Sequence, residues 1–111
     1  MLHYRNIDEI IDKILNLDEF ISNQDYFEKK FSNSLLQNQA KVFIYYLIKS
    51  IKAKSALEIG TYMAGTTKLI SEAIGNDGFV ISLESNKERE KSILKERETW
   101  DTKSQENTKL I

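Results

Sequence analysis

The sequence predicts an α/β fold in which N-terminal helices precede a short parallel sheet. Apolar residues recur at helical spacing over the first half of the chain. Two short β-like runs follow, and a third begins close to residue 111. The stretches that join these runs are long enough for helices, and a strand–helix–strand order of this kind favours a right-handed parallel sheet.

The composition is that of an ordinary globular domain. Of the 111 residues, 41% are hydrophobic and 30% are charged, and the formal net charge is −1. A chain of this length should bury more than ~60% of its unfolded surface, so a core is feasible. The balanced charge points to neither nucleic acid nor an anionic membrane as a partner. With no cysteine, no visible signal peptide and no apolar run that could span a bilayer, we expect a cytoplasmic protein without disulfides.

The first predicted helix begins near residue 6. Its apolar residues keep the i, i+3, i+4, i+7, i+8 spacing of one helical face. They are Ile7, Ile10, Ile11, Ile14 and Leu15. Asn6, with Glu9 three residues later, is a typical capping start.

Two more helices are expected before the first strand. Asp25 and Glu28 repeat the capping pattern at a short helix that carries Phe27 and Phe31. The helix over 36–51 has the strongest pattern, and we expect its apolar face to cover one side of the sheet. That face comprises Leu36, Ala40, Phe43, Ile44, Leu47, Ile48 and Ile51, whereas Gln37, Lys41, Lys49 and Lys52 lie on the other face. The aromatic residues Phe43, Tyr45 and Tyr46 are expected to serve helix packing.

The second half alternates strands and helices. In order, we expect a strand over 55–59, a helix over 64–74, a Gly/Asn turn over 75–78, a strand over 79–83, a charged helix over 87–98, a polar loop over 101–107 and a third strand from Thr108. Ser85 is the expected cap of the charged helix. Pairs such as Glu88 with Lys91 indicate a solvated helix face there.

Candidate functional residues gather where the first two strands end. Residues 57–67 read LEIGTYMAGTT, so Gly60 falls at the end of the first strand and Gly65 opens the following helix. A residue without a Cβ lets the backbone turn sharply and approach a ligand, and a helix start presents free N–H groups. Glu84 ends the second strand, where a carboxylate can accept hydrogen bonds from a ribose diol.

Two nucleotide-binding patterns fit this loop poorly. A dinucleotide fingerprint needs G-x-G-x-x-G, but Tyr62 stands at the second glycine. A P-loop needs a lysine after its second glycine, but Thr66 stands there, and Lys68 lies two residues farther along the helix. A P-loop-like nucleotide binder therefore stays a weaker alternative.

The pattern E-x-G-x-x-x-x-G-T-T after a strand, with an acidic residue ending the next strand, resembles motifs I and II of class I S-adenosylmethionine-dependent methyltransferases. The run from Ala56 to Thr61 is especially similar to the small O-methyltransferase branch. The resemblance covers about residues 35–111, and residues 1–34 form an additional N-terminal helical segment. It implies a Rossmann-like fold and methyl transfer from S-adenosylmethionine to a small-molecule acceptor, with an oxygen atom expected as the nucleophile. The cofactor has no phosphate, which agrees with a loop that lacks the P-loop lysine.

The resemblance also implies roles for individual residues. Glu58 is expected under the methionine part of the cofactor, near its ammonium group. Glu84 is expected to bind the ribose hydroxyls, with Ser85 beside the adenine. The remaining cofactor-binding residues belong to the loop and the helix start, and they are Gly60, Thr61, Tyr62, Gly65 and Thr66. A purely structural role of the two glycines, and a capping role of Glu58, are the alternatives to these assignments.

The chain departs from the family in its extent. Family members have a seven-stranded sheet, and this sequence supplies at most three strands. The strand that would pair with the free edge of 56–59 is missing, and acceptor-binding or metal-binding segments would lie beyond Ile111. We therefore expect an incomplete cofactor-binding portion without an identifiable catalytic base. The alternative is a non-catalytic remnant that acts as an interaction module and self-associates through its open edge. The only histidine, His3, is expected to be an exposed terminal residue, and no metal site is predicted.

Overall fold

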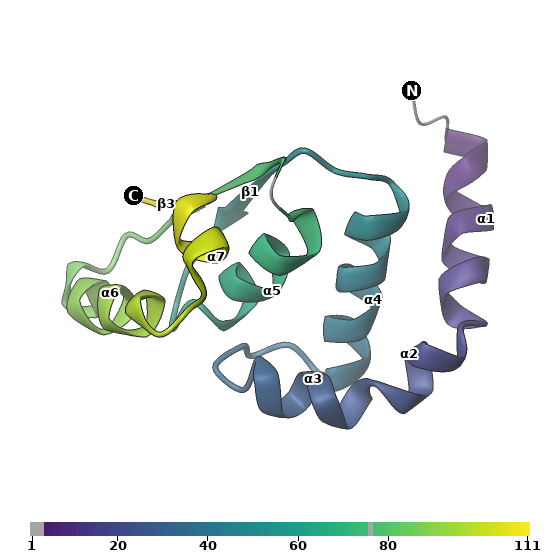
Figure 1. The fold of residues 1–111 in the computed structure, drawn as a ribbon, viewed down its shortest axis with the longest axis horizontal. Coiled ribbons are helices and arrows are strands. Elements are labelled where there is room, and N and C mark those ends of the chain that lie inside the picture. The colour runs from purple at the N-terminus through teal and green to yellow at the C-terminus, as the bar shows by residue number, and fades with distance from the viewer. Residues whose placement is uncertain (1–3, 76) are drawn as a thin grey trace.

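The structure is a computed structural model that describes residues 4–75 and 77–111. Its elements are α1 (Tyr4–Leu15), α2 (Asp18–Ser22), α3 (Gln24–Lys30), α4 (Asn38–Ser50), β1 (Ser55–Ile59), α5 (Gly65–Ile74), β2 (Phe79–Leu83), the 3₁₀ helix η1 (Lys87–Arg89), α6 (Glu90–Glu98), α7 (Thr102–Glu106) and β3 (Thr108–Leu110). Helices α1–α4 lie at one end of the molecule and α6 at the other, with the sheet and α5 between them (Figure 1). His3 and Asn76, which the sequence predicts at an exposed end and in a turn, lie outside the described residues.

The three strands form one parallel sheet in the order β1–β2–β3, which confirms the predicted α/β class. The predicted bounds of β1 and β2 are correct, and Thr108 begins β3 as expected. Ile59 pairs with Leu83, so β1 and β2 end at the same edge of the sheet. The loops that follow these two strands are therefore brought together.

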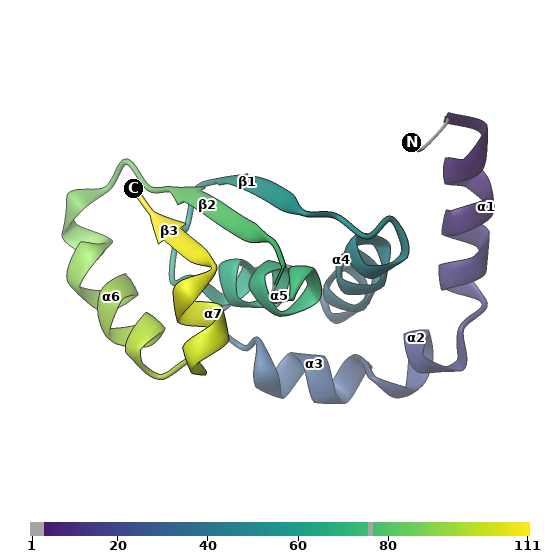
Figure 2. The same ribbon diagram turned by 45° about the horizontal axis from the view of Figure 1, so that its top comes forward.

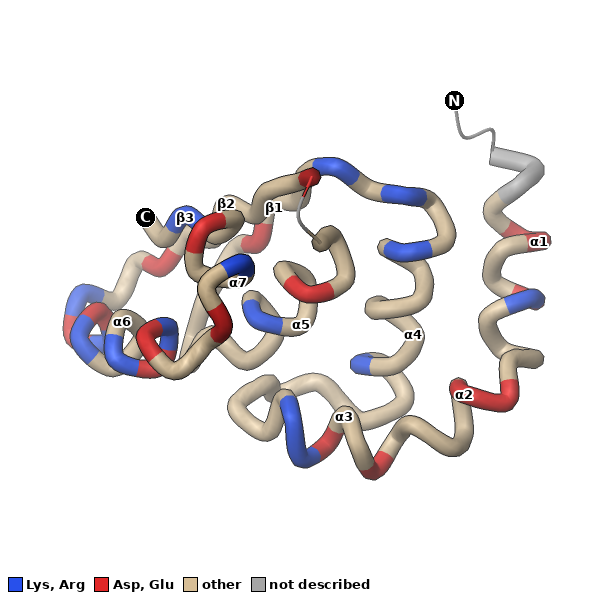
Figure 3. Tube along the Cα trace, in the orientation of Figure 1, with Lys and Arg blue, Asp and Glu red and all other residues tan. Residues whose placement is uncertain are grey.

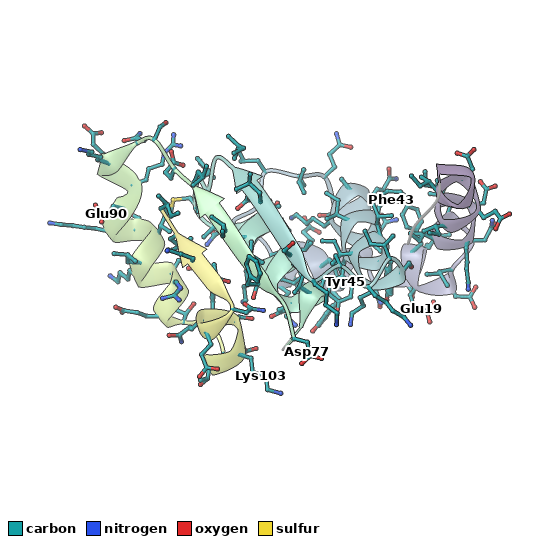
Figure 4. The ribbon with its side chains drawn as sticks, turned by 90° about the horizontal axis from the view of Figure 1, so that it is seen from above. Glu19, Phe43, Tyr45, Asp77, Glu90 and Lys103 are labelled. Carbon is teal, nitrogen blue, oxygen red and sulfur yellow. The ribbon has the colours of Figure 1, made fainter. Side chains whose placement is uncertain are left out.

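Helices α4, α5 and α7 lie below the strands in Figure 2, while α6 lies at the β3 end of the molecule and α1 at the opposite end. Helix α5 packs against β1 and β2. Seen from above, the strands lie in front of α5 with no helix over them (Figure 4). Because side chains alternate across a strand, the uncovered face presents Leu57, Ile59 and Phe79, which are 65%, 73% and 52% exposed.

Two hydrophobic clusters flank α5. The larger joins Phe27, Phe31, Val42 and Leu69 from α3, the end of α3, α4 and α5. The smaller joins Ala64, Ile93 and Trp100, with Leu110 packed against them. The first cluster fixes the N-terminal helices on α5. The second fixes α6 and β3 near the glycine loop, which is the β1–α5 connection over residues 60–64. The expected packing role of the helix aromatics is correct for Tyr45, whose ring lies 5.0 Å from that of Phe27 in an edge-on arrangement.

The expectation that the helix over 36–51 covers the sheet was wrong. Helix α4 packs against α1, α3 and α5, and it is α5 that contacts β1 and β2. The expected faces also differ, since Lys41 and Val42 are buried while Ile51 is 38% exposed. A helix with helical neighbours on several sides buries more than one stripe, and the long apolar stem of a lysine packs well in such a position.

Helix starts are the other point of difference. Helix α1 begins at Tyr4, so Asn6 lies inside it and is not the cap. Asn86, not Ser85, caps η1, because its side-chain oxygen accepts a hydrogen bond from the Glu88 N–H at 3.0 Å. The expected polar loop over 101–107 contains α7, which starts because the Asp101 carboxylate accepts a hydrogen bond from the Ser104 N–H at 2.8 Å. Helix α2 was not predicted, since its five residues are too few to show a period.

Charges are spread over the ends of the molecule. Red and blue positions alternate around η1 and α6, whereas much of α4 and α5 is uncharged (Figure 3). Glu88 and Lys91 form no ion pair; within residues 7–75 and 77–111 the ion pairs are Lys30–Glu72 and Glu84–Arg89. In the same part of the chain, no helix is long and apolar enough to cross a membrane.

Candidate functional site

The β1–α5 loop has an unusual backbone. Three of its five residues have left-handed φ angles: Gly60 at +90°, Tyr62 at +50° and Ala64 at +65°. The Gly60 N–H continues the pairing of β1 with β2 by donating to the Leu83 carbonyl at 2.7 Å, and the Ala64 N–H closes the turn by donating to the Thr61 carbonyl at 2.8 Å. Glycine adopts such angles freely, whereas Tyr62 and Ala64 do so at a cost that the surroundings must offset. The prediction that Gly60 turns the chain at the strand end is confirmed.

Gly65 serves a different purpose from Gly60. Residues Asn33 and Ser34 pass so close to Gly65 that a Cβ atom there would overlap their backbone. The Thr66 hydroxyl lies 2.5 Å from the Ser34 hydroxyl in the same contact. Gly65 therefore permits close packing, and its partner is the segment between α3 and α4.

Glu58 is held by two hydroxyl groups of the chain itself. Ser82 donates to its Oε1 atom at 2.6 Å, and Thr67 donates to the same oxygen. Both donors are fully buried. Burial raises the pKa of Glu58 above its usual value, and the two hydrogen bonds oppose that rise. Glu58 thus ties β1 to β2 and α5, and its second carboxylate oxygen accepts neither of these bonds.

Thr61 extends this network toward the loop. Its hydroxyl lies 2.6 Å from that of Ser82, and Thr61 is 3% exposed. Because Ser82 has one hydroxyl proton and donates it to Glu58, Thr61 must donate to Ser82. In this chain of hydrogen bonds, Thr61 donates to Ser82 and Ser82 donates to Glu58, which fixes the position of the loop on the sheet.

Glu84 closes the site from the end of β2. Its Oε1 atom accepts from the Tyr62 N–H at 2.8 Å, and its Oε2 atom accepts from the Asn86 N–H at 3.0 Å. Arg89 adds an ion pair at 3.5 Å. The Asn86 and Tyr62 hydrogen bonds, helped by the charge of Arg89, lower the pKa of Glu84. The glycine loop and the acidic residue expected to face each other therefore do so, and they are in direct contact.

Two cavities adjoin the loop. The larger, about 370 Å³, lies between the end of β2, α6 and the end of β3, and it is lined by Thr61, Glu84, Asn86, Lys87, Glu90, Ile93, Leu94, Leu110 and Ile111. The smaller, about 180 Å³, lies on the other side of the loop and is lined by Asn33, Ser34, Leu35, Leu36, Gly60, Thr61, Tyr62, Gly65 and Thr66. Glu58 and Ser85 line neither cavity.

The structure thus brings together most of the predicted site residues and adds others. Ser85, expected beside the adenine, is exposed and does not line the larger cavity, whereas its neighbour Asn86, also exposed, does. An Asn just before a charged helix is a capping signal that could have identified it. No local signal marks Ser34 or Ile93, because their approach to the loop depends on how α3 and α6 pack.

This arrangement can hold a small molecule that carries hydroxyl groups next to an apolar ring. Glu84 supplies an ionised acceptor, and Ile93, Leu94 and Leu110 supply an apolar surface in the same cavity. Lys68, the nearest candidate for a P-loop cation, instead lies with its Nζ atom 6.0 Å from the centre of the Phe31 ring. Among the described residues, no group of three or more His, Asp or Glu could hold a metal ion.

A glycine-bearing loop after the first strand, faced by a carboxylate at the end of the second, defines a nucleoside-binding type of Rossmann-like site. Residues 14–106 match the O-methyltransferase family. That match covers most of the chain, and the chain belongs to this family. No curated protein matches the sequence.

Solved structures share the fold. The O-methyltransferase TomG from Streptomyces achromogenes, involved in tomaymycin synthesis and solved with S-adenosylmethionine, is 18% identical with a TM-score of 0.59, and the match covers 99% of this chain and 51% of that one. An O-methyltransferase from Bacillus cereus, solved with S-adenosylhomocysteine, is 17% identical with a TM-score of 0.59, over 96% and 49% of the two chains. A methyltransferase from Podospora anserina, also solved with S-adenosylhomocysteine, is 15% identical with a TM-score of 0.59, over 100% and 50%. The present chain thus spans about half the length of these solved relatives.

Proposed function

We propose that this chain is the S-adenosylmethionine-binding part of a methyltransferase that methylates an oxygen atom of a small-molecule acceptor. The observation that carries the proposal is the contact between Glu84 and Tyr62, which sets an ionised carboxylate against the glycine loop at the rim of a 370 Å³ cavity. Membership of the O-methyltransferase family supports the reaction class. Solved relatives that contain S-adenosylmethionine or S-adenosylhomocysteine support the cofactor.

The residues present fit such a cofactor. A carboxylate offers about four lone-pair sites, and two strong hydrogen bonds to Glu84 leave room for ribose hydroxyls. Ile93 and Leu94 offer an apolar wall for an adenine ring. Gly60, Thr61 and Tyr62 supply the backbone that the methionine part would meet. Gly65 and Thr66 follow them at the start of α5. Ser85 and Glu58 line neither cavity. When bound, the cofactor supplies a methyl group on a sulfonium, and what these residues contribute is positioning.

A direct comparison of ligands tests the proposal. Thermal unfolding of the chain is followed with S-adenosylhomocysteine, with S-adenosylmethionine and with Mg-ATP at equal concentrations. Since a ligand that binds the folded state raises the unfolding temperature, we expect the two adenosyl-sulfur compounds to raise it more than Mg-ATP does. A larger rise with Mg-ATP would overturn the proposal and favour a P-loop-like nucleotide site.

A second candidate function rests on the uncovered sheet face. Leu57 and Ile59 are exposed there, and β1 has no neighbouring strand on its outer edge among the described residues. Exposed apolar strand edges favour pairing with another chain. We propose that the chain self-associates through this edge.

We also propose a cytoplasmic location for the protein, which cell fractionation would test.

A further inference from the structure

Arg89 makes two contacts at the candidate site that no sequence motif predicts. Its Nη1 atom lies 3.5 Å from Glu84 Oε1, and its guanidinium carbon lies 4.9 Å from the centre of the Tyr62 ring. The same Glu84 oxygen accepts the Tyr62 N–H at 2.8 Å. Arg89 therefore touches both partners of the hydrogen bond that joins β2 to the glycine loop.

The loop needs such support. Tyr62 has a φ angle of +50°, and a non-glycine residue in the left-handed region is strained unless its surroundings compensate. The Tyr62 N–H bond to a carboxylate is one compensation, since hydrogen bonds to an ionised acceptor are stronger than neutral ones. A guanidinium over the Tyr62 ring is a second, because cations are attracted to an aromatic face.

Exposure differs within the cluster. The Glu84 side chain is 11% exposed, whereas that of Arg89 is 40% exposed. The carboxylate thus depends on partners other than water, while the arginine can be replaced without opening a core. Removal of Arg89 should loosen the loop and leave the sheet intact.

We propose that Arg89 is a positioning residue that holds Glu84 and Tyr62 together, so that the loop has its binding shape before a nucleoside arrives. The ligand part of this inference rests on the proposed function. The loop part concerns the free chain alone. The two parts can be tested separately.

The first experiment measures amide hydrogen exchange by NMR in the ligand-free chain. We expect the Tyr62 amide to exchange about fivefold or more faster in Arg89→Met than in the wild type, with the Val80 and Leu69 amides unchanged. Arg89→Lys restores the charge and should recover part of the protection. Lys91→Met, which removes an exposed cation of α6 that neither lines the cavity nor pairs with Glu84, should leave Tyr62 unchanged. If Arg89→Met is too unstable to study, Arg89→Gln replaces it. Equal Tyr62 exchange in the wild type and the Arg89 variant would overturn the proposal.

The second experiment measures S-adenosylhomocysteine binding by titration calorimetry. We expect Arg89→Met to weaken binding about tenfold and Lys91→Met, at an exposed position outside the cavity lining, to leave it unchanged. If the wild type binds and Arg89→Met binds equally well, the positioning role in binding is overturned while the proposed function stands. If the wild type does not bind at millimolar concentration, the proposed function fails, and the exchange experiment still decides whether Arg89 holds the loop.

Discussion

A Cβ atom on Gly65 would lie 2.0 Å from the backbone nitrogen of Ser34, a distance that real side chains do not reach. The Ser34 nitrogen cannot easily move, because its N–H donates to the Phe31 carbonyl at 2.9 Å and Phe31 is part of the larger core cluster. The start of α5 is therefore fitted against the N-terminal segment. The smaller cavity beside the glycine loop exists only in that packed arrangement.

Adjacent substitutions at the start of α5 should have opposite consequences. Gly65→Ala should destabilise the fold by about 1–3 kcal/mol, because the added methyl group overlaps fixed backbone. Ala64→Gly should change stability by less than about 1 kcal/mol, because relief of the +65° φ angle offsets the loss of one buried methyl group. Urea unfolding followed by circular dichroism measures both. Equal losses in the two variants would contradict this account of Gly65.

The raised pKa of Glu58 makes a pH-dependent prediction. Because folding raises this pKa above its usual 4.5, the folded state favours the protonated form. The resulting stabilisation is complete below the unfolded pKa and is lost as the pH rises through the folded pKa. Glu58→Gln cannot ionise, so we expect its unfolding temperature to improve relative to the wild type between pH 4 and pH 7. Glu88→Gln, at an exposed position, is the control, and a parallel pH profile of Glu58→Gln and wild type would refute the prediction.

Asn107 should be a strong determinant of stability. Its side chain accepts from the Ser71 hydroxyl at 2.6 Å and donates to the Ser71 and Gly75 carbonyls at 3.1 and 3.0 Å, while the residue is 9% exposed. Asn107→Ala removes all three hydrogen bonds and leaves the buried Ser71 hydroxyl without its acceptor, so we expect a loss of about 2–4 kcal/mol. Asn16→Ala removes one exposed hydrogen bond, and we expect a change within about 0.5 kcal/mol. Similar denaturation midpoints for the two variants would show that the Asn107 side chain does not stabilise the packing of the start of β3 against α5.

Glu84→Ala should weaken cofactor binding directly. Charged hydrogen bonds are lost both to the ligand and to the loop, so we expect roughly a 10- to 150-fold weaker affinity for S-adenosylmethionine. Titration calorimetry measures this change in affinity, and it uses a form of the protein that binds the cofactor. Glu88→Ala removes a nearby exposed carboxylate that does not line the cavity, and it should bind normally. Unchanged affinity in Glu84→Ala would remove the assignment of the ribose site.

The exposed edge of β1 predicts association in solution. Size-exclusion chromatography with light scattering should give a mass above 12.9 kDa that rises with concentration. Leu57→Lys should reduce this association, because a charge on an exposed strand opposes pairing. Ile21→Lys, which alters an even more exposed apolar residue on α2, should not reduce it. A monodisperse monomer with a cooperative melt would argue that the edge is not an interaction surface.

Much of this fold can be predicted from the sequence, because it depends on local chemistry. The bounds of β1 and β2 follow from short apolar runs that end at Gly60 and Glu84, and the parallel order follows from the helix-length connections. The facing of the glycine loop and Glu84 follows in turn, because neighbouring parallel strands end at one edge. These are features of short range or of general topology, so one sequence suffices to predict them.

Tertiary packing decided the rest. A glycine is needed at position 65 because Ser34, 31 residues earlier, lies against it. The Glu58 carboxylate accepts hydrogen bonds from within the chain because Ser82 and Thr67 reach it. Arg89 joins the site because η1 turns it back toward Tyr62. In each of these contacts, the sequence around one residue does not indicate its partner. The free energy that favours the contacts arises only when α3, α5 and the sheet pack together.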